Sequence, residues 1–521
     1  MDATLRSFDP REVTRRQALA LLGGAAAGLA VVPGSMAQPA AGPPRRGGTL
    51  TYAHTQDVFV FDPGQLHLGN WPMFHSVYDS VVRLDEVLKP QPWLAESWEF
   101  GDGGRQLKLT LRKGVRFHSG REFTAEDVAF SVKHYQTAAL AANIRPQALL
   151  IKGVKVDGPS TAILQFDNPN PVIFDTLDLL FIIDKDSYAD IKRKGVGTGP
   201  FKFADWSPGD KVRLVRNPNY WKPGLPYLDE LVIQVFPDQQ GMVAALEAGR
   251  IDFVDTPTPQ DFLRVEKNKS FQALKMRSAL VANPNINVEN PKFANKYVRQ
   301  AINHAIDRKR YVEIATLGLS EPICLPSPRT SWAYYPELEG RCKFDLELAK
   351  KLMAQGGAAA GFEAEAIVST SSFPEGVVLA QIMRDDLAKI GIRLKIRDLE
   401  STEYTNIGDQ ARFPDIYIQL FGRSKKDPGS LFGTTVAFRP KTNIARFKSD
   451  EYANLVVDAA STVDQAKRKT LYRKLNEMLL EEAFSLAVAP RIDLFLLSGR
   501  VRNLRFSVDN MPYLGEVWLT Q

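Results

Sequence analysis

Strand and helix signals alternate along most of this sequence, and the alternation limits the folds that the chain can adopt. Residues 231–236 form an apolar strand segment, residues 239–248 have helical spacing and end before Gly249, and residues 251–254 are again a strand segment. The second half repeats this order, with strands predicted at 364–368, 392–399 and 415–421 and helices at 346–354, 377–390 and 465–482. Helical crossovers favour parallel pairing. The sequence therefore predicts an α/β fold with mixed sheets flanked by helices.

Local signals predict further elements around this pattern. Thr124 followed by Asp127 is typical of a capping box at the start of a helix. Apolar residues between 74 and 82 have helical spacing, which predicts one helix there. Further strands are predicted at residues 49–54, 107–111, 201–206, 212–215, 485–488 and 494–497.

Length and charge set the broad class of the protein. A chain of 521 residues has room for two or three domains. The net charge is +6, from 66 basic and 60 acidic residues. The longest basic runs, at residues 192–194, 308–310 and 467–469, lack interleaved aromatic residues that stack on bases. We therefore expect no nucleic acid partner.

The N-terminus is typical of an export signal. Arg15 and Arg16 precede a weakly apolar stretch, residues 18–32, which is too short to span a bilayer of roughly 30 Å. Small residues at 35–37 suit a signal peptidase. We predict a twin-arginine signal peptide at residues 1–37, read by the export machinery through the arginine pair, and a linker at 38–48. The expected product is periplasmic, soluble and not lipid-anchored; the alternative is an amphipathic or disordered N-terminus.

The two cysteines, Cys324 and Cys342, are compatible with a disulfide in an oxidising compartment. Closing a loop of that size contributes roughly 3 kcal/mol. The alternative is two buried free thiols.

Signatures of catalysis and of cofactor binding are mostly absent from the sequence. It contains no Gly-x-Ser-x-Gly elbow, no His-Glu-x-x-His, no phosphate loop and no cysteines at zinc spacing. Gly195, Gly197 and Gly199 precede Pro200 and a strand, which favours a tight turn over a nucleotide-binding loop. We expect no enzyme activity, no metal and no cofactor. An exported hydrolase with an unrecognised site remains the alternative from another class.

Several ordered segments carry a resemblance to a known family. They are PWLAESW at 92–98, LRKGVRFHSGREFTAEDVAFSV at 111–132, GTGPFKF at 197–203, NPNYW at 217–221, ALEAGRID at 245–252, VRQAINHAID at 298–307, FDLELAKKL at 344–352 and LAKIGI at 387–392. Together they resemble the family 5 extracellular solute-binding proteins, the peptide, nickel and oligosaccharide receptors of bacterial ABC importers. The resemblance covers essentially the whole chain after the signal peptide.

The resemblance implies a bilobal periplasmic binding protein fold of class II type. Lobe I would comprise residues 49–284 and 491–521, with an inserted subdomain at 78–193, and lobe II would comprise residues 285–490. A small-molecule ligand would bind in the cleft between the lobes, and hinge closure would bury it. The closed protein, expected to be a monomer, would then deliver the ligand to a transmembrane permease.

One segment departs from the peptide receptors of the family. In those proteins an aspartate four positions before a proline anchors the peptide's α-ammonium, whereas here Ser424 stands four positions before Pro428. Its neighbours are the cations Arg423, Lys425 and Lys426. A serine hydroxyl does not neutralise an ammonium, so a free-amine peptide is not the expected ligand. If Arg423 or a neighbouring lysine faces the cleft, an anionic organic solute is favoured. The alternatives are a solvated loop, and a peptide, oligosaccharide, opine or chelated-metal ligand.

Four further residues are candidates for ligand contact. Phe421 would stack on the ligand or belong to the core, and Trp332 would form an aromatic wall or pack internally. Thr55 and Gln56 follow the first strand, where family members often touch their ligands.

Overall fold

The computed structural model describes residues 42–520, except residues 59, 66–69, 138–143, 328, 330 and 423–425. The predicted signal peptide, with Arg15 and Arg16, and residues 38–41 of the predicted linker lie outside the described residues. Within the described ranges, no helix is long and apolar enough to cross a membrane.

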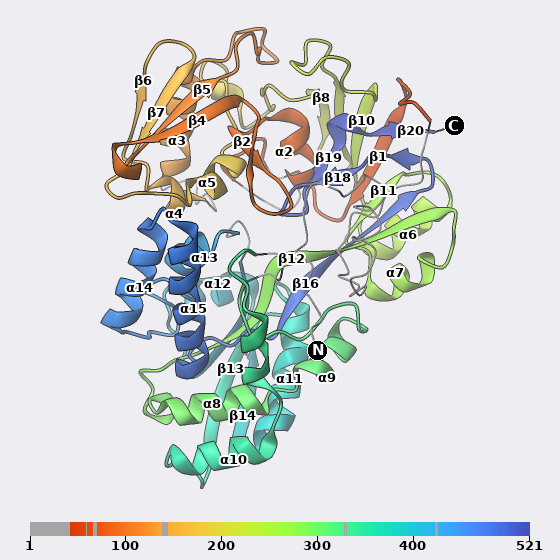
Figure 1. Ribbon diagram of the computed structural model, residues 1–521. Helices are drawn as coiled ribbons and strands as arrows, with labels where there is room; N and C mark the ends of the chain where they lie inside the picture. The colour runs from red at the N-terminus through yellow and green to blue at the C-terminus, as the bar shows by residue number, and fades with distance from the viewer. Residues whose placement is uncertain are drawn as a thin grey trace, which may run out of the picture. The chain divides into compact units, whose positions relative to one another are not determined.

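A ten-stranded sheet is the main element of the described chain (Figure 1). Its strands are β1 (Thr49–His54), β8 (Phe201–Ser207), β9 (Lys211–Arg216), β10 (Glu230–Val235), β11 (Phe253–Asp255), β12 (Phe271–Ile286), β13 (Phe362–Val368), β14 (Ile392–Asp398), β15 (Ile416–Phe421) and β16 (Ala489–Ser498). Their order is β14-β13-β15-β12-β16-β11-β1-β10-β9-β8. The long strands β12 and β16 therefore lie in the middle, between two groups of shorter strands.

The sheet is mixed, as the sequence predicts. β1 pairs in parallel with β10 and β11, and β13 pairs in parallel with β14 and β15. β12 is antiparallel to both β15 and β16. The helical crossovers thus account for two parallel groups, which the antiparallel strands β12 and β16 join.

Helices cover both faces of the sheet. Neighbouring residues of a strand point to opposite faces; accordingly Ala282 of β12 packs in one hydrophobic cluster and Val281 in another. The Ala282 cluster includes side chains of α8 (Lys296–Ala305), α9 (Arg308–Ala315), α10 (Leu346–Gln355) and α11 (Pro374–Ala388). The Val281 cluster includes α13 (Pro428–Thr434), α14 (Asp450–Ser461) and α15 (Gln465–Glu482). α6 (Gln239–Glu247) and α7 (Pro259–Val265) pack beside β11 and β16.

A second sheet lies within the segment predicted as an inserted subdomain. Its antiparallel strands, in the order β4-β5-β7-β6, are β4 (Ala95–Gly101), β5 (Gln106–Leu111), β7 (Thr161–Gln165) and β6 (Gly153–Val156). α3 (Ala125–Gln136) packs on it. The carboxylate of Asp127 accepts the backbone N–H of Thr124 at 2.9 Å, which confirms the capping box.

The remaining elements are short. They are α2 (Trp71–Val77), α4 (Arg145–Ala148), α5 (Ile173–Leu179), α12 (Ser401–Asp409), β2 (Val82–Leu84), β3 (Pro90–Pro92), β17 (Val501–Arg502), β18 (Arg505–Phe506), β19 (Pro512–Tyr513), β20 (Trp518–Leu519) and the 3-10 helices at Asp102–Gly104, Tyr188–Asp190, Pro291–Phe293, Pro336–Cys342 and Leu514–Glu516.

Two predicted elements are wrong. The predicted helix over 74–82 ends at Val77, because Tyr78 is extended and the Val77 carbonyl accepts the N–H of Gly199 at 3.0 Å. The predicted strand over 485–488 is reduced to an isolated bridge between Ser485 and Asn285, and the last long strand is β16. At both places tertiary contacts override the local apolar pattern.

The three glycines before Pro200 lie against the end of α2. A Cβ added at Gly197 or Gly199 would overlap the backbone around Val77. The glycines are therefore required for close approach of two backbone segments, and residues 198–200 form a bend that leads into β8.

The predicted lobe boundaries fall inside the two long strands. The boundary at 284/285 lies in β12, and the boundary at 490/491 lies in β16. The division of the chain into lobe I, lobe II and subdomain 78–193 stays a prediction, and the two lobes are referred to below by these ranges.

Candidate ligand-binding site

The carboxyl ends of the parallel strands indicate where a ligand binds. In open α/β sheets, ligands bind outside these ends, where the connecting loops diverge. Here the ends of β1 and β11 supply one set of loops, and the ends of β13, β14 and β15 supply another.

A pocket of about 220 Å³ with a mixed polar and apolar lining lies at the carboxyl ends of β13 and β15. Its lining includes Ser372 after β13, Thr405 of α12, and Gln419 near the end of β15. The Ser372 hydroxyl is hydrogen-bonded to Ser401 at 2.7 Å. Among the described residues, the buried Nε2 of Gln419 has no hydrogen-bond partner. The pocket therefore offers an amide donor to a ligand oxygen.

A second pocket adjoins the first, since both are lined by Phe373 and Leu420. Its wall from lobe I includes Pro259, Ile492 and Leu494, and its wall from lobe II includes Tyr311, Phe373 and Glu375. Residues on both sides of the predicted boundaries thus line one pocket beside β12 and β16.

The carboxyl ends of β1 and β11 carry a buried polar cluster. Tyr52 donates its hydroxyl to Asp255 at 2.7 Å, and His54 Nε2 lies 3.4 Å from the same carboxylate. Burial raises the pKa of Asp255, although His54 opposes the effect. This cluster fixes the point at which the chain leaves β1 towards Thr55 and Gln56.

Arg277 stands at a β-bulge of β12, between the two groups of parallel strands. Its Nη1 donates to Glu321 at 3.0 Å, and Glu321 also pairs with Arg329 at 3.0 Å. The Nε and Nη2 atoms of Arg277 are buried and have no hydrogen-bond partner among the described residues. Burial lowers the pKa of Arg277, while Glu321 opposes the shift. Arg277 is not among the described residues that line the two pockets, but its guanidinium has two nitrogens without an acceptor.

The four candidate residues predicted from sequence differ in burial and contacts. Phe421 is a core residue, 4% exposed and in edge contact with Phe438. Trp332 is half-buried between Tyr472 and the guanidinium of Arg468, which lies 5.0 Å from its ring centroid. Gln56 is exposed and Thr55 is half-buried. None of these four is among the described residues that line the two pockets. Their ligand contacts stay predictions.

The predicted cation cluster is only partly described. Arg423, Ser424 and Lys425 lie outside the described residues. Lys426 is buried, with its Nζ 2.7 Å from Asp178 and 2.8 Å from Asp509. The solvated-loop alternative is therefore wrong for Lys426, and its charge is already neutralised within the protein.

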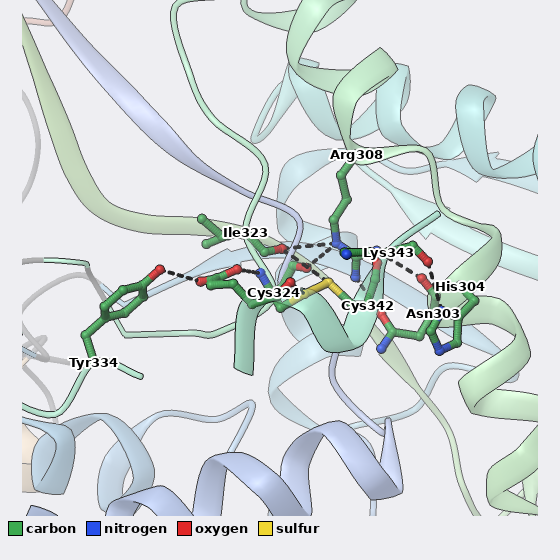
Figure 2. The surroundings of a disulfide bond; sticks show 10 residues. Asn303, His304, Arg308, Ile323, Cys324, Tyr334, Cys342 and Lys343 are labelled. Atoms are coloured by element: carbon green, nitrogen blue, oxygen red, sulfur yellow. Dashed lines mark hydrogen bonds between the residues drawn. A yellow bond between two sulfur atoms is a disulfide. The ribbon is translucent and has the colours of Figure 1, made fainter. Parts of the chain in front are cut away.

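A disulfide joins Cys324 and Cys342, whose Cα atoms are 5.8 Å apart (Figure 2). The buried guanidinium of Arg308 donates beside it to the backbone carbonyls of Ile323 at 3.1 Å and Cys342 at 3.3 Å. Burial lowers the pKa of Arg308 to about 10. Both ends of the loop that carries Trp332 are thus fixed.

Sequence reasoning missed Arg277 and Gln419. The available signals were weak: Arg277 is a lone arginine in a strand that was not predicted, and Gln419 is a glutamine within an otherwise apolar strand. Neither signal shows which side chain stays unpaired after folding.

Comparison with known proteins places the chain in a family. The model for bacterial extracellular solute-binding proteins, family 5, matches residues 89–443. Heme-binding protein A of Haemophilus influenzae is 30% identical over 492 residues, which cover 87% of this chain and 89% of that protein. The structure of HbpA2 from Haemophilus parasuis has a TM-score of 0.80 at 25% identity and covers 91% of this chain and 100% of that one. DppA from Helicobacter pylori, in complex with the peptide STSA, has a TM-score of 0.77 at 26% identity, covering 92% and 99%. The chain therefore belongs to the family 5 solute-binding proteins, the bilobal substrate-binding components of ABC importers.

Proposed function

We propose that this protein is a periplasmic receptor for a small organic anion, rather than for a peptide with a free α-ammonium. The ligand binds between lobe I and lobe II, beside β12 and β16, and a permease receives it. The receptor acts as a monomer without covalent chemistry. The twin-arginine signal at residues 1–37 directs its export.

The unpaired guanidinium of Arg277 carries this proposal. A buried donor without a partner is destabilising by about 1–3 kcal/mol, and more when the group is charged. A carboxylate or similar anion accepts two parallel hydrogen bonds from a guanidinium. Glu321 occupies Nη1 only, so Nε and Nη2 remain for the ligand.

The acidic groups near the end of β15 argue against an ammonium ligand. Asp427 accepts the N–H of Gly429 at 2.7 Å and pairs with Arg468 at 2.6 Å. Asp178 and Asp509 both pair with Lys426. These carboxylates already have cationic partners, so none of them is available to a peptide N-terminus.

The names of the similar proteins suggest other ligands. Heme is named for one, and peptides for others. Among the described residues that line the two pockets, there is no histidine, cysteine or methionine. Tyrosine is therefore the one usual axial ligand of heme that these described lining residues supply, through Tyr311, Tyr404 and Tyr417. A peptide whose α-amine is blocked or absent would still satisfy Arg277 through its carboxylate.

Binding would act through closure of the lobes. β12 and β16 cross the predicted boundaries, and the register of their pairing shifts between Arg277 and Val281. A ligand that contacts both lobes binds the closed form better and shifts the population towards it. Arg277 lies at this irregularity, where a bound anion would bridge side chains of both lobes.

The test begins with native mass spectrometry of freshly purified protein, which identifies any ligand that co-purifies. Thermal shifts are then measured with succinate, citrate, glutamate and trialanine. We expect stabilisation by at least one of the carboxylates or by the co-purified anion, and its loss in Arg277→Gln. Arg105→Gln, which alters an exposed arginine paired with Asp102, is the matched control.

The proposal is wrong if trialanine stabilises the protein at low-micromolar concentration while binding of every anion is unchanged in Arg277→Gln and Arg423→Ala. Product formed from a bound compound would instead support the hydrolase alternative.

A further inference from the structure

A buried ion triad joins three segments that are distant in sequence. Lys426, in the loop after β15, places its Nζ 2.7 Å from Asp178 Oδ2, at the end of α5, and 2.8 Å from Asp509 Oδ2, between β18 and β19. The three side chains are 3%, 1% and 3% exposed. Asp178 is held in place because its other oxygen accepts the N–H of Leu84 at 2.9 Å.

The backbone beside Lys426 contacts the same helix. The N–H groups of Lys426 and Asp427 both donate to Asp175 Oδ2, at 3.0 and 2.8 Å. Gly429 allows the close approach, since an added Cβ would overlap the side chain of Val172. Lys426 is therefore docked on α5 through both its side chain and its backbone, and Asp427 through its backbone.

This contact joins the predicted lobes away from the two long strands. Lys426 belongs to lobe II, Asp178 to the inserted subdomain of lobe I, and Asp509 to the C-terminal segment of lobe I. A buried ammonium is stable only when it is paired and hydrogen-bonded. If the lobes separate at this contact, the Lys426 ammonium moves away from Asp178 and Asp509 and becomes exposed to solvent.

The environment keeps Lys426 charged. Burial alone would lower the pKa of Lys426, but Asp178 and Asp509 raise it above its usual range. Because Asp178 and Asp509 are two carboxylates and Lys426 supplies one ammonium, the triad also repels an anionic ligand. The triad is thus a binding site for one primary ammonium, and the protein supplies that ammonium itself.

We propose that Lys426, Asp178 and Asp509 form an interlobe latch, in which a side chain of lobe II fills an ammonium-binding site on lobe I. This inference rests on the proposed lobes and on the proposed receptor function. The latch holds this part of the interface between the lobes closed without an ammonium group from the ligand. It also excludes ligand ammonium groups from the site, and Lys426 is thereby a specificity-determining residue.

Truncation followed by chemical rescue tests the latch. Lys426→Ala removes the ammonium and leaves space between the two carboxylates for a short alkylammonium ion. We expect a lower melting temperature and a larger radius of gyration by small-angle scattering. Propylammonium chloride at millimolar concentration should restore at least half of the lost melting temperature and reduce the radius of gyration again.

The controls separate the latch from general effects. Lys448→Ala, which removes an exposed lysine paired with Glu289, should change neither quantity. Wild-type protein should not respond to propylammonium, and 1-propanol should not rescue Lys426→Ala. The latch is refuted if Lys426→Ala has the melting temperature and radius of gyration of the wild type, or if propylammonium and 1-propanol act equally.

If Lys426→Ala does not fold, the neutral variant Lys426→Met/Asp178→Asn/Asp509→Asn replaces it. Hydrogen exchange at residues 173–179 and 426–434 should then be at least tenfold faster than in the wild type, and unchanged protection overturns the latch. These measurements use no transported ligand. Failure of the receptor proposal, in which Arg277→Gln leaves anion binding unchanged, is therefore distinguishable from failure of the latch.

Discussion

Removal of the disulfide should destabilise the protein by an amount set by the loop that it closes. Cys324 and Cys342 are 18 residues apart, and closing a loop of that size stabilises the folded state by about 3 kcal/mol. Both cysteines are buried, at 5% and 4% exposure, so replacement by alanine also removes packing contacts. Reduction of the wild-type protein keeps both sulfurs and isolates the effect of the bond.

Urea unfolding monitored by tryptophan fluorescence would measure this difference. We expect reduced wild-type protein to lose about 3 kcal/mol of unfolding free energy relative to oxidised protein. Its melting temperature should fall by roughly 6–12 °C if a unit of about 200 residues unfolds cooperatively. Cys324→Ala/Cys342→Ala should be destabilised at least as much, and it should not respond to the reductant.

Two outcomes would refute this reasoning. Alkylation of two thiols in the non-reduced folded protein would show that the bond is absent. A loss below about 0.5 kcal/mol on reduction would show that the loop is already held by other contacts. The buried donors of Arg308 to Ile323 and Cys342 would then be the first candidates.

Two more predictions follow from buried groups. Gly197→Ala should be destabilising by about 1–3 kcal/mol in urea unfolding, because its Cβ would overlap the carbonyl of Val77. The control Gly433→Ala lies in α13 with open space around it, so it should be neutral or stabilising by up to about 1 kcal/mol. Equal destabilisation by the two changes would contradict the close-approach explanation. Burial and the neighbouring Asp427 raise the pKa of Asp175 to about 7, against the opposing charge of Lys426. A raised folded pKa contributes stability that is complete below the unfolded pKa and is lost as pH rises through about 7. Unfolding free energy should therefore fall more steeply between about pH 4 and 7 in the wild type than in Asp175→Asn, and parallel pH profiles would contradict the assignment.

Local signals predicted most regular elements because their causes are local. The helix after Thr124 begins where its capping box predicts, and the hairpin of β8 and β9 turns at Pro208 and Gly209. β12 was not predicted because its sequence does not follow a single pattern of alternating apolar and polar residues. Lys275 is exposed, but Asn283 and Asn285 are buried and hydrogen-bonded to Ser485.

The candidate site was less predictable than the fold. The sequence identified the loop after β15 as important, but it did not distinguish a cation that faces a ligand from one that pairs internally. Lys426 is paired with Asp178 and Asp509, residues 248 and 83 positions away in the chain. Arg277 became a candidate only when two of its nitrogens proved to be buried without partners.

The sequence by itself determined the alternation of elements, the family and the general class of function, because periodicity, capping residues and ordered motifs are properties of neighbouring residues. Tertiary structure alone decided that Phe421 is core, that Lys426 is neutralised and that Arg277 has donors left for a ligand. Burial and charge pairing depend on groups brought together from distant segments, and their energies depend on how completely water is removed.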